Sequence, residues 1–257
     1  LSIADLFCIK NMDIYVKDEY KRVEPHVKKA IQTLICPSEP SVSIGLQCSN
    51  PYECLFKNYC FKDVPKPSVL DLYKMKKEIR WDFYNEGKKL FSDLTDEDLG
   101  NSVFRHNQVK GVPYINKKEI LKFLKTLSYP LYFLDFETMM FAVPPYKNLK
   151  PYQQIPFQYS LHYRTSYDGT IFHTEYLAES DKDPRREIAE RLCSDIPKNV
   201  CVLAYNKTFE CGRLKELAAL FPDLAEHLLC IEKNIKDLID PFKAGHYYLP
   251  AMGGSCS

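Results

Sequence analysis

The most apolar stretch of the chain runs from Tyr129 to Thr138, and two acids, Asp135 and Glu137, interrupt its second half. A short run of consecutive aromatic and aliphatic residues is typical of a strand buried on both faces, in the middle of an α/β sheet. Residues i and i+2 of a strand point to one face, so the two carboxylates should lie side by side, with Cα atoms roughly 6.5 Å apart. Adjacent carboxylates repel each other unless a cation lies between them. The pattern therefore predicts a metal site on a central strand.

The residues after this stretch are expected to alternate between strands and helices. Alternating apolar positions indicate strands at Pro156–Tyr163 and Thr170–Tyr176. Asp183 as a cap and Pro184 at the first position begin a helix, Pro184–Ile196, and Val200–Ala204 reads as a buried strand. This order predicts an α/β domain with a mixed sheet flanked by helices.

Asn206 and Glu210 follow the strand at Val200–Ala204 directly. Glu210 falls in the first turn of a predicted helix, where the helix dipole stabilises a negative charge. A carboxylate pair on one strand and a further acid at a later strand-to-helix junction predict a site that carries several carboxylates.

The first half of the chain has a different pattern. A strand is predicted at Ala4–Ile9 and a helix at Tyr20–Leu34, which Cys36-Pro37 ends. Pro65 and Pro67 mark a linker. Beyond it, short helical patterns occur at Val69–Lys77, Trp81–Glu86, Asp96–Gln108 and Lys117–Leu127.

Three cysteines, Cys48, Cys54 and Cys60, are separated by five residues each, whereas the other cysteines are scattered singly. Equally spaced thiolates on a short segment favour a soft metal, either in an iron–sulfur cluster or as tetrahedral zinc. Both need a fourth donor, and Cys36 and Cys8 are the local candidates. The alternative is three buried cysteines with no metal.

Composition limits the partners and the cellular location that we expect for the protein. With a formal charge of +1 the chain as a whole does not attract nucleic acid or membrane electrostatically, so such a partner requires a local patch of basic residues. No apolar run approaches the roughly 20 residues that span a bilayer, and Leu1 opens no signal peptide. Ten cysteines in a chain without an export signal indicate a reducing, cytoplasmic location. The missing initiator Met and the Gly253–Ser257 end suggest a fragment of a longer protein.

The run Cys48-Ser-Asn-Pro-Tyr-Glu-Cys54, continued to Tyr59-Cys60, resembles the C-terminal end of RecB-like nucleases that hold a 4Fe–4S cluster. The resemblance implies that residues 1–64 are a remnant of that nuclease. Its catalytic core and fourth cluster ligand would then precede Leu1 in the same polypeptide. Residues 65–128, with Ser68-Val-Leu-Asp-Leu72 and the run Tyr84–Leu94, resemble helix-hairpin-helix-like inserts, and a plain helical spacer is the alternative.

Three motifs of residues 129–257 carry a second resemblance. They are Leu134-Asp-Phe-Glu-Thr138, Pro151-Tyr-Gln-Gln-Ile-Pro-Phe-Gln-Tyr-Ser-Leu-His162 and Tyr205-Asn-Lys-Thr-Phe-Glu210. Together they resemble the DEDD exonuclease superfamily, whose fold is RNase H-like. More narrowly, they resemble an uncharacterised bacterial domain family that is fused behind RecB-like nucleases. The departure is Glu210, where most DEDD enzymes have Asp.

The DEDD resemblance implies a metal-dependent nuclease, a 3′–5′ exonuclease that hydrolyses DNA or RNA with two Mg²⁺ or Mn²⁺ ions. Asp135 would bridge both ions, Glu137 would hold the ion on the side of the attacking water, and Glu210 the ion on the leaving-group side. Asn206 would fix the loop or contact the water shell of a metal ion. Three amide side chains are expected near the cleft that holds the metal ions, where they would contact a nucleotide: Gln153, Gln154 and Gln158.

Two further expectations follow from the sequence. The DEDD pattern requires a Tyr or His at a fixed spacing before its last acid. None of the three aspartates considered after Glu210 has one, and these are Asp223, Asp237 and Asp240. The fourth carboxylate is therefore expected beyond Ser257, and this chain by itself is expected to be inactive. The alternative function is a nucleic-acid-binding scaffold with a vestigial carboxylate site and a structural iron–sulfur or zinc cluster. No membrane partner is expected.

Overall fold

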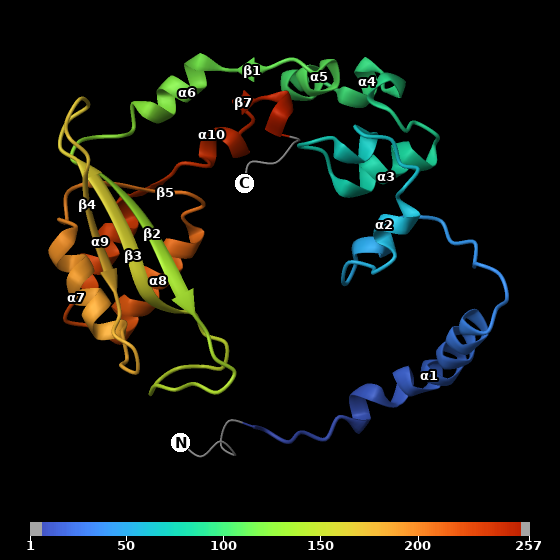
Figure 1. Ribbon diagram of the computed structural model, residues 1–257, viewed down its shortest axis with the longest axis horizontal. Helices are drawn as coiled ribbons and strands as arrows, with labels where there is room; N and C mark the ends of the chain where they lie inside the picture. The colour runs from blue at the N-terminus through green and yellow to red at the C-terminus, as the bar shows by residue number, and fades with distance from the viewer. Residues whose placement is uncertain (1–6, 253–257) are drawn as a thin grey trace.

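A five-stranded mixed sheet organises the second half of the molecule (Figure 1). The structure is a computed structural model, and it describes residues 7–252. The sheet contains β2 (Leu131–Met139), β3 (Ile155–Arg164), β4 (Phe172–Leu177), β5 (Cys201–Ala204) and β6 (Ile235–Asp237), in the order β4-β3-β2-β5-β6. β2, β3 and β4 pair antiparallel, whereas β5 is parallel to β2 and β6 is parallel to β5. The predicted α/β class with a mixed sheet is confirmed.

The central position of β2 explains its apolar sequence. Tyr132, Leu134 and Phe136 belong to the main core. On the opposite face Leu131 packs with Cys201 and Leu203, covered by Phe123 and Leu127. Both faces of β2 are therefore buried at its beginning, as the sequence predicts.

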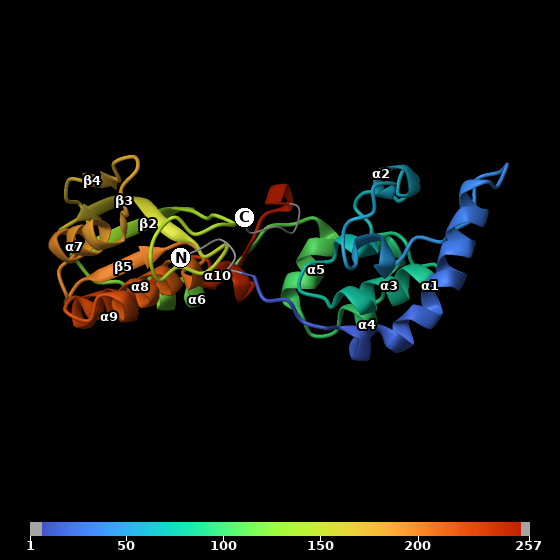
Figure 2. The same ribbon diagram turned by 90° about the horizontal axis from the view of Figure 1, so that it is seen from below.

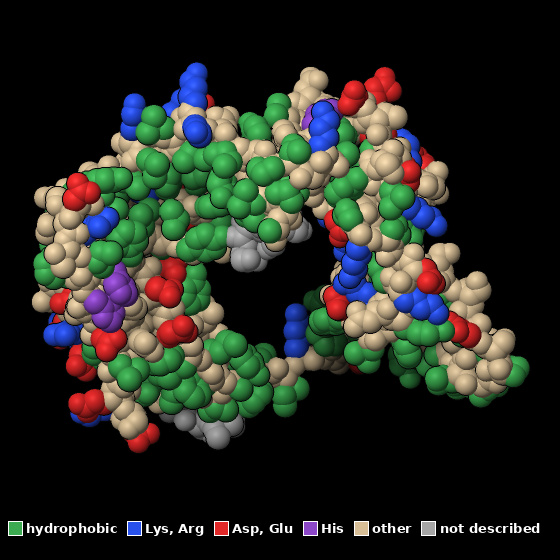
Figure 3. Space-filling model, turned by 45° about the horizontal axis from the view of Figure 1, so that its top comes forward, with side chains coloured by type: hydrophobic (Ala, Val, Ile, Leu, Met, Phe, Trp, Pro, Cys, Tyr) green, Lys and Arg blue, Asp and Glu red, His purple; other side chains and the backbone are tan. Residues whose placement is uncertain are grey.

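The far end of β2 has one open face. Asp135 and Glu137 are exposed and alternate with the buried Leu134 and Phe136. Their partners on β3 are Ser160 and Gln158, and directly paired residues of neighbouring strands share a face. On the same face the rings of His162 and His173 stack 4.2 Å apart. Figure 3 shows histidine and acidic side chains exposed together on this part of the surface.

Three helices cover the other face of the sheet, as Figures 1 and 2 show: α7 (Arg185–Asp195), α8 (Thr208–Leu220) and α9 (Ala225–Asn234). Each contributes a buried apolar stripe, for example Ile188 and Leu192 from α7. The helix predicted at Pro184–Ile196 is thus confirmed with one residue fewer at each end. β4 begins and ends later than the predicted Thr170–Tyr176, because Phe172 is the first residue that pairs with β3.

The chain between the N-terminus and the sheet is mostly helical. Its elements are α1 (Asp13–Leu34), α2 (Lys57–Cys60), α3 (Lys77–Asn85), α4 (Asp96–Leu99), α5 (Val103–Lys110), β1 (Tyr114–Ile115) and α6 (Lys117–Leu124). β1 pairs antiparallel with β7 (Tyr247–Tyr248), which follows α10 (Asp240–Lys243). Phe104 and Tyr248 also contact each other, with ring centroids 5.1 Å apart. The end of the described chain therefore packs on the helical segment that precedes the sheet.

The N-terminal helix is longer than predicted and packs on nothing among the described residues. α1 contains the predicted Tyr20–Leu34 and starts at Asp13, and none of its residues is buried. Ala4 to Leu6 of the predicted strand Ala4–Ile9 lie outside the described residues, and Phe7 to Ile9 do not form a strand. No helix between residues 7 and 252 is long and apolar enough to cross a membrane.

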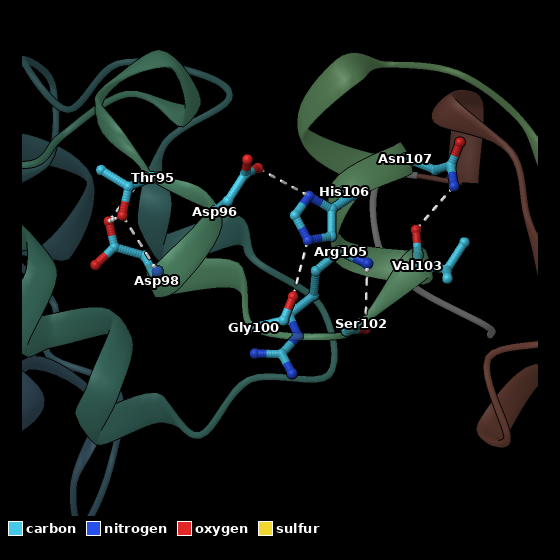
Figure 4. Close-up of polar contacts among 9 residues, drawn as sticks. All are labelled: Thr95, Asp96, Asp98, Gly100, Ser102, Val103, Arg105, His106 and Asn107. Atoms are coloured by element: carbon cyan, nitrogen blue, oxygen red, sulfur yellow. Dashed lines mark hydrogen bonds and ion pairs between the residues drawn. The ribbon is translucent and has the colours of Figure 1, made fainter.

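Two predicted helices of the middle segment are wrong. Asp96–Gln108 is divided into α4 and α5 at Gly100, whose φ of +57° and ψ of −158° lie outside the helical region. Figure 4 shows how the break is held: the His106 ring lies 2.8 Å from the Gly100 carbonyl oxygen and 3.4 Å from Asp96 Oδ1. Val69–Lys77 contains only a 3₁₀ turn, Val69–Asp71.

Asp71 caps the start of the 3₁₀ turn by accepting the backbone N–H of Ser68 at 2.8 Å, and the turn ends at Leu72, whose ψ of 114° is extended. The next helix, α3, starts at Lys77 and contains most of the predicted Trp81–Glu86. α6 ends at Leu124, three residues before the predicted Leu127, and Thr126 and Leu127 continue as turns.

Candidate carboxylate site

Glu210 is a buried acid with one unsatisfied oxygen. β5 ends at Ala204 and α8 begins at Thr208, which places Glu210 in the first turn of α8, as predicted. The residue is 4% exposed, and its Oε2 atom has no hydrogen-bond partner among the described residues. Burial raises the pKa of Glu210, and the charges of Asp135 and Asp237 raise it further, while its own backbone N–H lowers it. A buried carboxylate oxygen without a partner is unstable in the charged form.

Asp237 reaches this site from the neighbouring parallel strand. It is the last residue of β6 and pairs with Ala204, the last residue of β5. The carboxyl ends of β5 and β6 therefore meet at one edge of the sheet, where α8 starts. Asp237 is 5% exposed, and its Oδ1 accepts the backbone N–H groups of Asn206 at 2.8 Å and Ile239 at 3.2 Å.

Asp135 and Glu137 are both exposed on β2, two residues apart. Asp135 is close enough to Glu210 to raise the pKa of Glu210 by its charge, whereas Glu137 is not among the causes. The charge of Asp135 therefore acts on Glu210, as the charge of Asp237 does. Glu137 lies two residues further along the same exposed face of β2.

Asn206 holds the loop between β5 and α8. Its backbone has a φ of +62°, a left-handed conformation that Asn tolerates better than most residues. Its side-chain Oδ1 accepts from Lys243 Nζ at 3.0 Å, and its backbone N–H donates to Asp237. Of the two predicted roles, these contacts favour fixing the loop.

None of the four acids has a basic partner within residues 7–252. Asp135, Glu137, Glu210 and Asp237 form no ion pair with Lys, Arg or His there. Over the same residues, no group of three or more His, Cys, Asp or Glu side chains lies in an arrangement that could hold a metal ion. The donor set is nevertheless all oxygen, as Mg²⁺ and Mn²⁺ prefer. The unpartnered Glu210 Oε2 is the atom that a cation would satisfy.

Residues 132–257 match the family described as Domain of unknown function (DUF2779). The chain carries a DUF2779 domain. The domain contains nearly the whole sheet, helices α7 to α10 and all four acids. Comparison with curated proteins and with solved structures gave no match. The predicted uncharacterised domain family is in agreement with this finding.

The sequence pattern excludes three acids from the site, Asp223, Asp237 and Asp240, yet the charge of Asp237 is close enough to raise the pKa of Glu210. Of the other acids considered, Asp223 pairs with Arg186 Nη2 at 2.8 Å, and Asp240 begins α10. The sequence gives only a weak indication that Asp237 ends a strand. The three residues Ile235-Lys236-Asp237 are too few to show the alternation of apolar and polar positions that is typical of strands.

The three glutamines lie at two places. Gln153 and Gln154 line a cavity beside α8, where Gln154 Oε1 accepts from Arg213 Nη1. Gln158 lies on β3 opposite Glu137, on the sheet face that carries the exposed acids. The structure brings Gln158 next to a predicted metal ligand and places the other two in a separate pocket.

The three cysteines of the N-terminal segment are free thiols. Cys48 lies in a 3₁₀ turn, Leu46–Ser49, and its carbonyl accepts the backbone N–H of Cys54 at 3.0 Å. Cys60 ends α2. They form no complete metal site within the described chain, so the iron–sulfur or zinc cluster stays a prediction.

Proposed function

We propose that the DUF2779 domain is a metal-dependent phosphodiesterase that acts on nucleic acid, in the manner of a 3′–5′ exonuclease. The observation that carries the proposal is the buried Oε2 atom of Glu210, which has no hydrogen-bond partner within residues 7–252 and whose carboxyl group feels the charges of Asp135 and Asp237. Neighbouring negative charges cost folding energy unless a cation neutralises them. The mixed sheet with flanking helices is compatible with the RNase H-like fold that the resemblance implies.

Asp135, Glu210 and Asp237 would hold the cation, with Glu137 as a further ligand on the exposed side. Asp135 and Glu137 are exposed and free to change rotamer, while burial keeps Glu210 and Asp237 in place. When bound, Mg²⁺ or Mn²⁺ supplies Lewis-acid stabilisation for the negative charge that builds on the phosphodiester. Asn206 and Lys243 position the loop from which α8 presents Glu210.

The expected inactivity of this chain alone depended on a missing fourth carboxylate. Asp237 fills that place in our proposal, so the chain itself should cleave. The predicted RecB-like neighbour and the 4Fe–4S cluster, with zinc as the alternative, are not needed for this activity and remain proposals for the larger polypeptide.

Cleavage of single-stranded DNA and RNA oligonucleotides labelled at the 5′ end tests the proposal. We expect shortening from the 3′ end with Mn²⁺, none with EDTA, and a loss of about 100-fold or more in Asp135→Asn. Asp223→Asn, which removes a surface acid paired with Arg186, is the matched control and should cleave normally. Equal rates for Asp135→Asn and the unaltered chain would refute the assignment. Strand binding without cleavage would favour the scaffold alternative.

A further inference from the structure

A cavity of about 270 Å³ lies between α8 and the loop that leads into β3. Its walls combine basic, amide and apolar side chains. Those used below are Lys150, Gln153, Gln154, Arg185, Arg213 and Leu220.

Two of these residues are arginines with almost fully buried side chains. The Arg185 side chain is 9% exposed and the Arg213 side chain is 12% exposed. Arg185 donates to both oxygens of Asp183 and, through Nη2, to the Lys147 carbonyl oxygen at 2.7 Å. These bonds hold one guanidinium rigidly at the wall of the cavity.

Arg213 is held equally well, yet it keeps an unused donor. Its Nη1 donates to Gln154 Oε1, and its Nη2 donates to Glu216 Oε1 at 2.8 Å. Its Nε is buried and has no hydrogen-bond partner within residues 7–252. Each Nη atom carries two N–H groups and the bonds to Gln154 and Glu216 use one of each, which leaves the second N–H groups of Nη1 and Nη2 as donors for a ligand oxygen.

The charges around the cavity leave one positive charge unbalanced. Lys150, Arg185 and Arg213 line it together with one acid, Glu216. Counting also Asp183, which pairs with Arg185, gives three cations against two anions. One phosphodiester carries a single negative charge, and guanidinium groups bind phosphate oxygens through paired N–H donors.

The cavity adjoins the carboxylate site. Glu210 and Arg213 are three residues apart on α8, and residues at this spacing are neighbours on a helix surface. Ile155, next to the lining residues Gln154 and Pro156, pairs with Met139 at the end of β2. The cavity therefore lies along the same helix as Glu210 and near the end of β2.

We propose that the cavity binds one phosphodiester of the nucleic-acid strand, next to the phosphodiester that is cleaved. The guanidinium groups of Arg185 and Arg213 and the ammonium of Lys150 donate to the phosphate oxygens, Gln153 adds an amide contact, and Leu220 packs against the sugar. The proposal depends on the proposed function for the identity of the ligand, and it does not depend on metal binding.

The test measures strand binding without cleavage. Fluorescein-labelled dT₁₅ and rU₁₅ are titrated with the full chain in EDTA, and anisotropy is recorded across a series of salt concentrations. Loss of one phosphate contact to a single strand lowers the slope of log K against log salt by about 0.7. We expect this change in Arg213→Gln, with an affinity lower on the order of tenfold at low salt. Arg213→Lys should retain the slope, because it keeps the charge.

Two variants control for folding and for general charge effects. Lys150→Gln changes an exposed lining residue that forms no ion pair in the described chain, and it should lower the slope without altering the thermal transition. Arg186→Gln removes a surface cation outside the cavity and should bind as the unaltered chain does. Unchanged slopes in both Arg213→Gln and Lys150→Gln would overturn the proposal. Because EDTA removes divalent metal, a failure of the metal site alone leaves this result unaffected.

Discussion

Replacing Glu210 by Gln should stabilise the metal-free protein. Glu210 is buried, its Oε2 has no partner in the described part of the chain, and Asp135 and Asp237 raise its pKa. The amide has nearly the same shape, carries no charge, and can donate to a neighbouring carboxylate. The penalty for an unsatisfied buried group is about 1–3 kcal/mol, and more for a charged one. We therefore expect a gain of at least about 1 kcal/mol near pH 7.

Thermal unfolding in EDTA measures this gain. A change of 1 kcal/mol corresponds to roughly 2–4 °C for a chain of this size, so the transition temperature of Glu210→Gln should rise by at least about 2 °C. The matched control is Glu226→Gln on α9, whose side chain is 88% exposed and pairs with Lys198. A surface pair of this kind contributes about 0–1 kcal/mol, so the control should be unchanged or slightly less stable.

The gain should also depend on pH. Because the folded-state pKa of Glu210 is raised, the folded protein holds this proton more tightly than the unfolded chain does. The stability that the bound proton of Glu210 contributes is fully present below the pKa of the unfolded chain, about 4.3. It is lost as the pH rises through the raised pKa of the folded protein. The two proteins should therefore be similar near pH 4 and diverge as the pH rises toward 7. A Glu210→Gln protein that is less stable at pH 7, or a difference independent of pH, would refute the reasoning.

Two further predictions concern the N-terminal half. Gly100→Ala should cost about 1–3 kcal/mol, because φ +57° and ψ −158° is a region for glycine alone; the control Gly212→Ala, inside α8 with nothing within 4 Å of the added Cβ, should be neutral or stabilising in the same urea titration. Anaerobic reconstitution of a polypeptide that includes the predicted RecB-like segment should give iron, sulfide and a visible absorption band that Cys54→Ser removes, whereas stoichiometric zinc without iron would replace the cluster by a structural zinc site.

The sequence predicts those parts of the fold whose signals are local. The run at Tyr129–Thr138 indicates a buried central strand, and the structure has it as β2. Asp183 and Pro184 indicate the start of α7, and the junction after Val200–Ala204 places Glu210 in a first helical turn. Each of these depends on periodicity or capping within a few residues.

The features that the sequence misses depend on distant pairing or on single backbone angles. Asp237 reaches Glu210 only because a three-residue strand, β6, pairs with β5, and no local pattern reports that pairing. The break between α4 and α5 depends on the conformation of Gly100, which an amphipathic pattern through Asp96–Gln108 does not reveal. The apolar stripe of α1 predicts a buried face, yet Val23, Val27 and Ile31 are exposed within the described chain.

Mn²⁺ binding to the purified chain, measured from the electron paramagnetic resonance signal of free Mn²⁺, tests the carboxylate site most directly. The account predicts saturable binding to the unaltered chain, and binding at least about tenfold weaker in Asp135→Asn and in Asp237→Asn, since each removes a charged oxygen ligand. Asp223→Asn should bind as the unaltered chain does. Equal Mn²⁺ binding by all four proteins, or no binding by any of them, would contradict a metal site built from Asp135, Glu210 and Asp237.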